Sequence, residues 1–81
     1  MNIKEMALLA KQHWKAHDPA GYDRLVKDGA LESEAMGAAK LTRSEMDTLM
    51  TGGFMSETQA WEAARGLYII NDNALKDYDP D

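Results

Sequence analysis

The stretch from Ser56 to Ile70, SETQAWEAARGLYII, most constrains the fold of this chain, because helix-start chemistry and helical periodicity agree there. Ser56 and Gln59 have the spacing of a capping box, in which each side chain satisfies a backbone N–H of the first turn. The apolar residues that follow recur at the three- and four-residue steps of one helix face: Ala60, Ala63, Ala64, Leu67 and Ile70. The sequence therefore predicts a helix from Glu57 to about Ile70, with Trp61 in the core.

Two earlier helices are predicted by similar signals. Asn2 has a glutamate three residues later and predicts a first helix that runs to about Ala16. Asp18-Pro19 ends this helix, because the residue before proline is displaced from the α region, and the same pair starts a second helix. Asp28-Gly29 ends the second helix, since glycine readily adopts the left-handed conformation found at helix ends. Its apolar side is formed by Tyr22, Leu25 and Val26.

Residues 31–50 can be interpreted in two ways. Leu31–Ala39 is expected to be helical. Its small residues allow close helix approach, although one of them, Gly37, also weakens the helix. These small residues are Ala35, Gly37, Ala38 and Ala39. Thr42 is followed three residues later by a glutamate, which predicts a separate helix over Arg43–Met50. A single bent helix over the whole segment is the alternative.

The expected fold class is all-α, a small bundle of four to five short helices with no sheet. No internal repeat occurs, and no run of alternating apolar and polar residues is long enough for a strand. With 81 residues the chain suffices for one domain with one small core. We expect residues 1–73 to form this single helical domain and residues 74–81 to form an acidic, frayed C-terminal tail.

The charge balance points to a protein partner with a basic surface. The formal net charge is −5, which disfavours nonspecific binding to phosphates, so no direct nucleic-acid binding is expected. The carboxylates expected to bind the partner are Asp23, Asp28, Glu32 and Glu34, the alternative being that they form a solvated, solubilising surface.

The remaining composition indicates a soluble, cytoplasmic protein. No cysteine is present, which excludes disulfides and fits a reducing compartment. The first residues lack the charged-then-apolar pattern of a secretory leader, and no apolar run approaches the roughly 20 residues of a membrane span. We therefore expect neither secretion nor membrane association.

The sequence does not predict catalysis, a cofactor or a metal site. His13 and His17 are four residues apart on the first helix, a spacing that lets two imidazoles reach one metal, but Trp14 occupies the position of the general-base glutamate in the zinc-protease motif. The chain has no third histidine and no cysteine to complete such a site. No nucleophile is placed beside a base, and no glycine-rich phosphate loop follows a strand. We therefore expect a protein that is not an enzyme.

The segment from Arg43 to Ile70 offers the sharpest alternative, a helix-turn-helix. Its second helix would present Glu57, Glu62 and Arg65 to the DNA, which is the wrong sign of charge for phosphates. The connection is also longer than the usual three or four residues.

A cluster of flexible apolar side chains surrounds the same connection. Methionine-rich surfaces are used for adaptable binding, but methionine also fills irregular gaps between short helices. We interpret these residues as core residues and as a hydrophobic staple of the last helix: Met46, Met50, Phe54 and Met55.

Taken in order, the segments HDPAGYDRLVKDGAL, MDTLM and AWEAARGLYI resemble small helical proteins carried by phages and mobile elements, including the transposon-associated TnpV type. The matching pattern is a His-x-Pro-x-x-Tyr-x-x-Leu opening, a Gly-x-Leu turn, a methionine-rich helix and an Ala-Trp-Glu helix. The residues in those places are His17, Pro19, Tyr22, Leu25, Gly29, Leu31, Met46, Met50, Trp61 and Glu62. The resemblance implies a mobile-element setting and no catalytic residue.

Two functions remain open. The first is a non-enzymatic, acidic interaction module, phage or mobile-element encoded, that binds and inhibits a larger nucleic-acid-handling protein, as an anti-CRISPR-like or other counter-defence inhibitor would. The second is a helix-turn-helix-like DNA-associated accessory or regulatory protein. The oligomeric state also stays open, with a homodimer as one option.

Overall fold

The computed structural model describes residues 1–71 and Leu75, and these residues form four α-helices and no strand. The helices are α1 (Ile3–His17), α2 (Pro19–Lys27), α3 (Leu31–Met50) and α4 (Glu57–Tyr68). The predicted all-α class is confirmed. The predicted tail over residues 74–81 lies outside the described residues except for Leu75, which is buried against the core.

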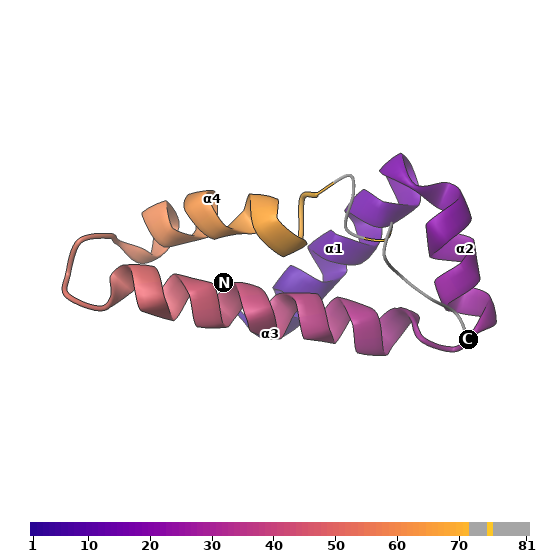
Figure 1. Cartoon of the computed structure of the whole chain (residues 1–81), viewed down its shortest axis with the longest axis horizontal. Helices are drawn as coiled ribbons and strands as arrows, with labels where there is room; N and C mark the ends of the chain where they lie inside the picture. Colours follow the sequence, from indigo (N-terminus) through magenta and orange to yellow (C-terminus); the bar gives the residue numbers. More distant parts are fainter. Residues whose placement is uncertain (72–74, 76–81) are drawn as a thin grey trace.

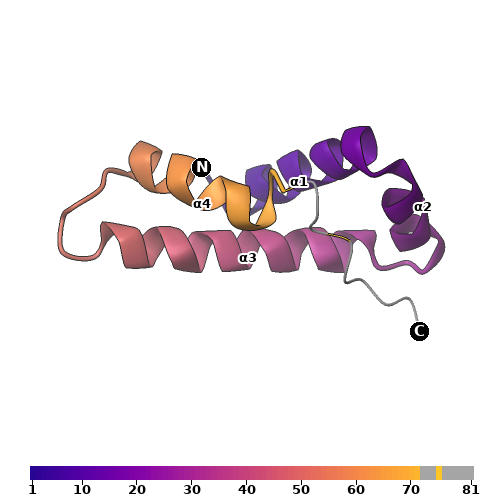
Figure 2. The ribbon, with the colours of Figure 1, turned by 45° about the horizontal axis from the view of Figure 1, so that its top comes forward.

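The longest helix, α3, is the platform on which the others pack (Figure 1). In both ribbon views α4 lies along the C-terminal half of α3, α1 lies on the same side toward the N-terminal half, and α2 closes that end (Figure 2). The molecule is elongated, with extents of 42 × 20 × 19 Å.

The predicted helix caps are present. The side chain of Asn2 accepts a hydrogen bond from the backbone N–H of Glu5, and that of Asp18 accepts one from Gly21. Ser56 and Gln59 exchange both hydrogen bonds of the capping box, at 3.2 and 3.0 Å. These contacts satisfy backbone donors that the first helical turn leaves unpaired, so the starts of three helices are fixed by local chemistry.

The prediction of a separate helix starting at Arg43 is wrong, and the alternative of one helix holds. Thr42 does not cap a helix. Its side chain is fully buried in the interior of α3, and its hydroxyl donates to the carbonyl oxygen of Ala38 at 2.8 Å. A threonine can satisfy its hydroxyl in this way within a helix. The three-residue spacing of Thr42 and Glu45 therefore does not mark a helix start here.

The last helix is also shorter than predicted. It ends at Tyr68 rather than Ile70, and the backbone N–H groups of Ile69 and Ile70 both donate to the carbonyl oxygen of Arg65. The side chain of Ile69 is fully buried, whereas Leu67 and Ile70 are largely exposed. The apolar run at the end of the helix is therefore only partly covered by the described residues.

The core is rich in alanine. Six of the twelve buried apolar side chains among the described residues are alanines, and they lie in pairs three or four positions apart: Ala7 and Ala10, Ala35 and Ala39, and Ala60 and Ala64. Such small side chains let helix axes approach closely. The larger core residues fill the remaining space: Met6, Trp14, Leu25, Met46, Ile69 and Leu75.

Several apolar residues are less buried than the sequence suggested. Phe54 is 86% exposed, so its assignment to the core or to a hydrophobic staple is wrong. Its ring lies close to Gly52 in a turn where Gly52 and Gly53 both have positive φ, a conformation that glycine adopts readily. Trp61 is only partly buried, and Val26 on α2 is exposed.

The two tryptophans should contribute unequally to stability. Trp14 is 3% exposed, so Trp14→Ala should cost about 3–5 kcal/mol, the range for emptying a large aromatic site. Trp61→Ala should cost clearly less, and Phe54→Ala should stay within about 0.5 kcal/mol of the parent protein. Urea unfolding followed by far-UV circular dichroism measures all three. A loss for Trp61→Ala that equals or exceeds the loss for Trp14→Ala would contradict the burial described.

Thr42→Val distinguishes an interior residue from a cap. Valine has nearly the same shape and a similar helix propensity, so the variant should stay within about 0.5 kcal/mol of the parent protein. Ser56→Ala is the matched control, because Ser56 is a true cap and its loss should cost about 1 kcal/mol. A free energy of unfolding lowered as much by Thr42→Val as by Ser56→Ala would instead support a helix start at Thr42.

Candidate interaction site

The four carboxylates predicted to bind a partner lie at one end of the molecule. Asp23 is on α2, Asp28 is the C-cap residue of that helix, and Glu32 and Glu34 lie in the first turn of α3. All four are exposed. The turn between α2 and α3 thus brings them to the same end of the bundle (Figure 1).

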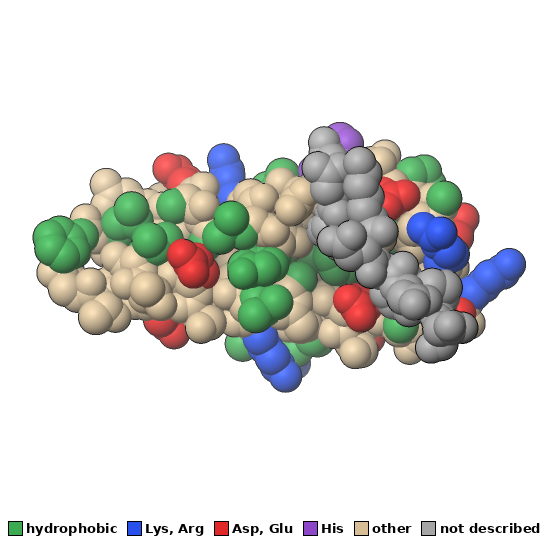
Figure 3. All heavy atoms as spheres, viewed as in Figure 1, with side chains coloured by type: hydrophobic (Ala, Val, Ile, Leu, Met, Phe, Trp, Pro, Cys, Tyr) green, Lys and Arg blue, Asp and Glu red, His purple; other side chains and the backbone are tan. Residues whose placement is uncertain are grey.

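This acidic end is not purely acidic. Glu32 forms an ion pair with Lys11 of α1, and the last turn of α2 carries Arg24 and Lys27. Acidic and basic side chains accordingly lie near each other over this end of the face shown in Figure 3. The local field is weaker than the four carboxylates alone would give.

Two of the carboxylates also have a structural role. The N-cap residue of α3 is Ala30, which makes no side-chain hydrogen bond to the helix start. Glu32 and Glu34 in the first turn place negative charge at the positive end of the helix dipole, which is a stabilising arrangement. Their presence is therefore partly explained without a partner.

A groove of about 410 Å³ runs between α3 and the end of α4. We call it the α3–α4 groove. One side is formed by residues of α3: Ser33, Glu34, Gly37, Ala38 and Leu41. The other side is formed by Leu67, Tyr68 and Asn71, and Trp14 of α1 and Leu75 complete the lining. Of the four predicted carboxylates, Glu34 is the one that lines this groove.

The groove is flanked by exposed apolar side chains. Leu41 is 53% exposed and Leu67 is 48% exposed, and hydrophobic side chains gather over α3 and α4 on the face shown in Figure 3. The lining also includes the polar residues Ser33, Glu34 and Asn71, so the groove combines apolar and polar groups. Concave sites with both kinds of group are a common form of binding site.

The groove lining also contains an unsatisfied donor. Trp14 is nine-tenths buried or more, and its indole Nε1 has no hydrogen-bond partner among the described residues. Burying a polar group without a partner is unfavourable, and such groups in folded proteins call for an explanation.

Sequence reasoning missed most of this groove. The one local signal was Gly37, a glycine in the interior of a predicted helix, which we expected to permit close helix approach. Among residues 1–71 and 75, nothing lies within 4 Å of the position that a Cβ on Gly37 would occupy. That interpretation is wrong for Gly37, because the glycine faces open space in the groove.

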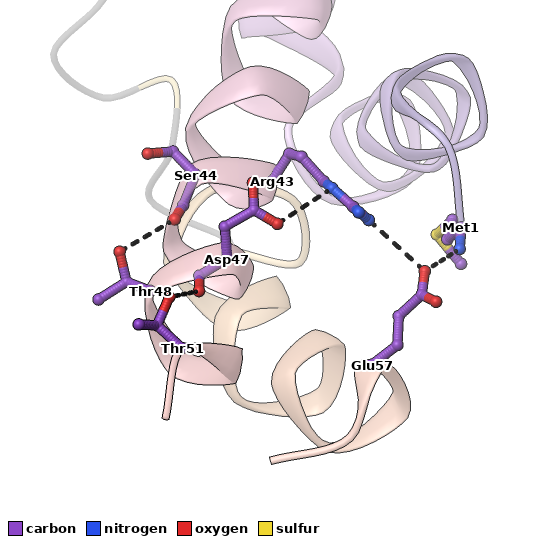
Figure 4. A network of polar contacts seen from close by, with 7 residues as sticks. All are labelled: Met1, Arg43, Ser44, Asp47, Thr48, Thr51 and Glu57. Carbon is purple, nitrogen blue, oxygen red and sulfur yellow. Dashed lines mark hydrogen bonds and ion pairs between the residues drawn. The ribbon is translucent and has the colours of Figure 1, made fainter. Parts of the chain in front are cut away.

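A second polar cluster joins the start of the chain to α3 and α4 (Figure 4). The carboxylate of Glu57 accepts a hydrogen bond from the N-terminal ammonium group of Met1 at 2.8 Å and lies 3.5 Å from Arg43. Arg43 in turn lies 3.4 Å from Asp47. The hydrogen bond and the charge of the ammonium group, with a smaller contribution from Arg43, hold the pKa of Glu57 below its ordinary value of 4.5.

The lowered pKa gives Glu57→Gln a pH-dependent effect on stability. A carboxylate with a depressed pKa in the folded state stabilises the fold above its unfolded pKa, and this contribution is lost as the pH falls through the folded pKa. Glu57→Gln should therefore lower the melting temperature at pH 7, and the difference should shrink below about pH 4.5. The control is Glu62→Gln, an exposed position on the same helix. A difference that stays constant from pH 7 to pH 3, or that matches the control, would contradict the ion pairs.

The two histidines lie together on α1. The ring centroids of His13 and His17 are 4.2 Å apart, with 30° between the planes. Among residues 1–71 and 75, no group of three or more histidine, cysteine, aspartate or glutamate residues is placed to hold a metal ion. No helix in the same part of the chain is long and apolar enough to cross a membrane.

The segment considered as a helix-turn-helix forms a hairpin. α3 and α4 lie side by side in both ribbon views and are connected by residues 51–56. In a helix-turn-helix the two helices cross at about 90–120° around a turn of three or four residues. The geometry of α3 and α4 is that of an αα-hairpin.

Comparison of the chain with protein families, with characterised proteins and with solved structures gave no match.

Proposed function

We propose that this protein is a non-enzymatic interaction module that binds a larger protein through a basic surface of that partner. The observation that carries the proposal is the α3–α4 groove, which combines exposed leucines with the carboxylate of Glu34 at its edge. A rigid helical scaffold with such a groove can hold a partner's side chains without refolding, which reduces the entropic cost of association.

The charge of the chain supports a basic partner. The net charge of −5 favours approach to a positively charged surface and speeds the encounter at low salt. Proteins that handle nucleic acids present such surfaces, and an acidic binder seated there competes with the nucleic acid. We therefore propose inhibition of a nucleic-acid-handling protein, of the anti-CRISPR-like or other counter-defence kind. The resemblance to small phage and mobile-element proteins supports the same setting.

Two contacts support different roles for the four carboxylates. Glu32 is engaged by Lys11, whereas Glu34 lines the groove. Within the predicted group of Asp23, Asp28, Glu32 and Glu34, we propose that Glu34 makes the central contact and that Asp23 and Asp28 steer the approach.

The proposal is tested with a partner captured from nuclease-treated lysate of the native host, followed by binding kinetics. The association rate should fall by about tenfold or more between low salt and a few hundred millimolar salt, since steering by charge is screened. Glu34→Lys should slow association and speed dissociation, whereas Glu62→Lys, on the exposed side of α4, should change binding little. Nucleic acid should compete for the captured partner.

Two results would contradict the proposal. One is association that ignores both salt and Glu34→Lys. The other is a gel shift of duplex DNA by the protein alone at low salt, which would favour the DNA-associated alternative.

A further inference from the structure

One residue of α3 that lines the α3–α4 groove has no side chain. Gly37 lies in the interior of a helix, where glycine is less favourable than alanine. It has no positive φ, and a Cβ on it would meet no atom of the described residues within 4 Å. Neither backbone conformation nor close helix packing accounts for the glycine. Gly37 leaves its part of the groove lining without a side chain.

One residue of the groove lining carries a buried hydrogen-bond donor that the described residues do not use. This residue is Trp14, and the buried Nε1 of its indole ring has no acceptor among those residues. An indole N–H can only donate, so a group that satisfies it must bring an acceptor oxygen. The peptide carbonyl is the acceptor that every protein partner carries.

The length and charge of the groove fit a short extended segment with a cationic side chain. The α3 side runs from Ser33 to Leu41, which is about 12 Å along a helix at ~1.5 Å per residue. An extended segment at ~3.3 Å per residue would place about four residues along it. The ionisable carboxylate of Glu34 at the edge of the groove complements a cationic side chain.

We propose that the α3–α4 groove binds an extended segment of the partner protein that contains a lysine or arginine, an inference that rests on the proposed function. A backbone carbonyl of the segment accepts the hydrogen bond from Trp14 Nε1 after a shift of the indole ring, because Nε1 is buried in the unbound groove. The basic head group pairs with Glu34, and the aliphatic part of that side chain lies against Leu41 and Leu67. Gly37 provides the space in which the backbone of the segment approaches α3.

The test uses short peptides as probes and the indole N–H signals as the readout. The chain has two tryptophans, so ¹H–¹⁵N spectra contain two indole signals, which Trp61→Phe assigns. Acetyl-Ala-Arg-Ala-amide should shift the Trp14 indole signal on titration. Trp61 lines a separate hollow with Met1 and Met46, so its signal should remain in place as an internal reference. The probe with norleucine in place of arginine should bind more weakly, and the probe with glutamate more weakly still.

Two glycine variants separate groove binding from changes in stability. Gly37→Gln puts a side chain into the groove while improving helix propensity, so it should abolish the Trp14 shift without lowering the melting temperature. Gly66→Gln makes the same change at a helical glycine of α4 that also faces open space but does not line the groove. This variant should bind the arginine probe like the parent protein.

Glu34→Gln tests the charge contact. Because Glu34 is exposed, its pairing with a cation contributes modestly, and the variant should weaken the arginine probe about two- to fivefold. The norleucine probe should bind Glu34→Gln and the parent protein equally.

Three results would overturn the inference. The first is no shift of the Trp14 indole signal at millimolar arginine probe, and the second is equal binding of the arginine and glutamate probes. The third is an unchanged titration with Gly37→Gln. A captured partner whose binding depends on salt but is unchanged by Gly37→Gln would support the proposed function and exclude the groove as its binding site. Conversely, peptide binding in the groove without any basic protein partner would exclude the proposed function and support the groove as a peptide-binding site.

Discussion

The fold depends on α3 remaining helical without interruption from Leu31 to Met50. The helices α1, α2 and α4 all pack against it, and both ribbon views place α1 and α4 on its same side (Figure 2). The contact is made by a stripe at helical spacing, Ala35, Ala39, Thr42 and Met46. Thr42 is in the middle of this stripe, so a break there would separate the part of α3 that carries α4 from the part that meets α2.

Small side chains determine both the contacts and the groove. Ala35 and Ala39 face the core and let neighbouring helices come close, whereas Gly37 and Ala38 face the groove and leave it open. One run of small residues in α3 therefore serves two surfaces, because successive positions of a helix point in different directions. Counting small residues along the sequence does not separate these two uses.

The sequence predicted those features that arise from local chemistry. The caps at Asn2, Asp18 and Ser56 depend on side chains that bond to backbone groups three residues away, so their spacing suffices. Thr42 had the same spacing but became an interior residue, because burial against other helices outweighed the local signal. Phe54 was assigned to the core because it is large and apolar, but it lies exposed beside a turn in which Gly52 and Gly53 have positive φ.

The candidate site was much less predictable than the helices. Glu34 was singled out from charge alone, but its neighbours in the groove come from α1, α3 and the chain after α4. Their proximity depends on how the helices pack, and the periodicity of apolar residues in the sequence does not predict this packing. The unsatisfied Nε1 of Trp14 is a property of this packing as well, since the sequence marked the residue only as apolar.

Native-state hydrogen exchange of the α3 backbone tests the central claim most directly. In a continuous helix the N–H groups of Arg43, Ser44 and Glu45 each bond to the carbonyl four residues back, so they should be protected as strongly as those of Ala39 and Met46. In two separate helices these same groups would occupy an unpaired first turn. Exchange at Arg43, Ser44 and Glu45 that is orders of magnitude faster than at Ala39 and Met46 would contradict a continuous α3 and the arrangement built on it.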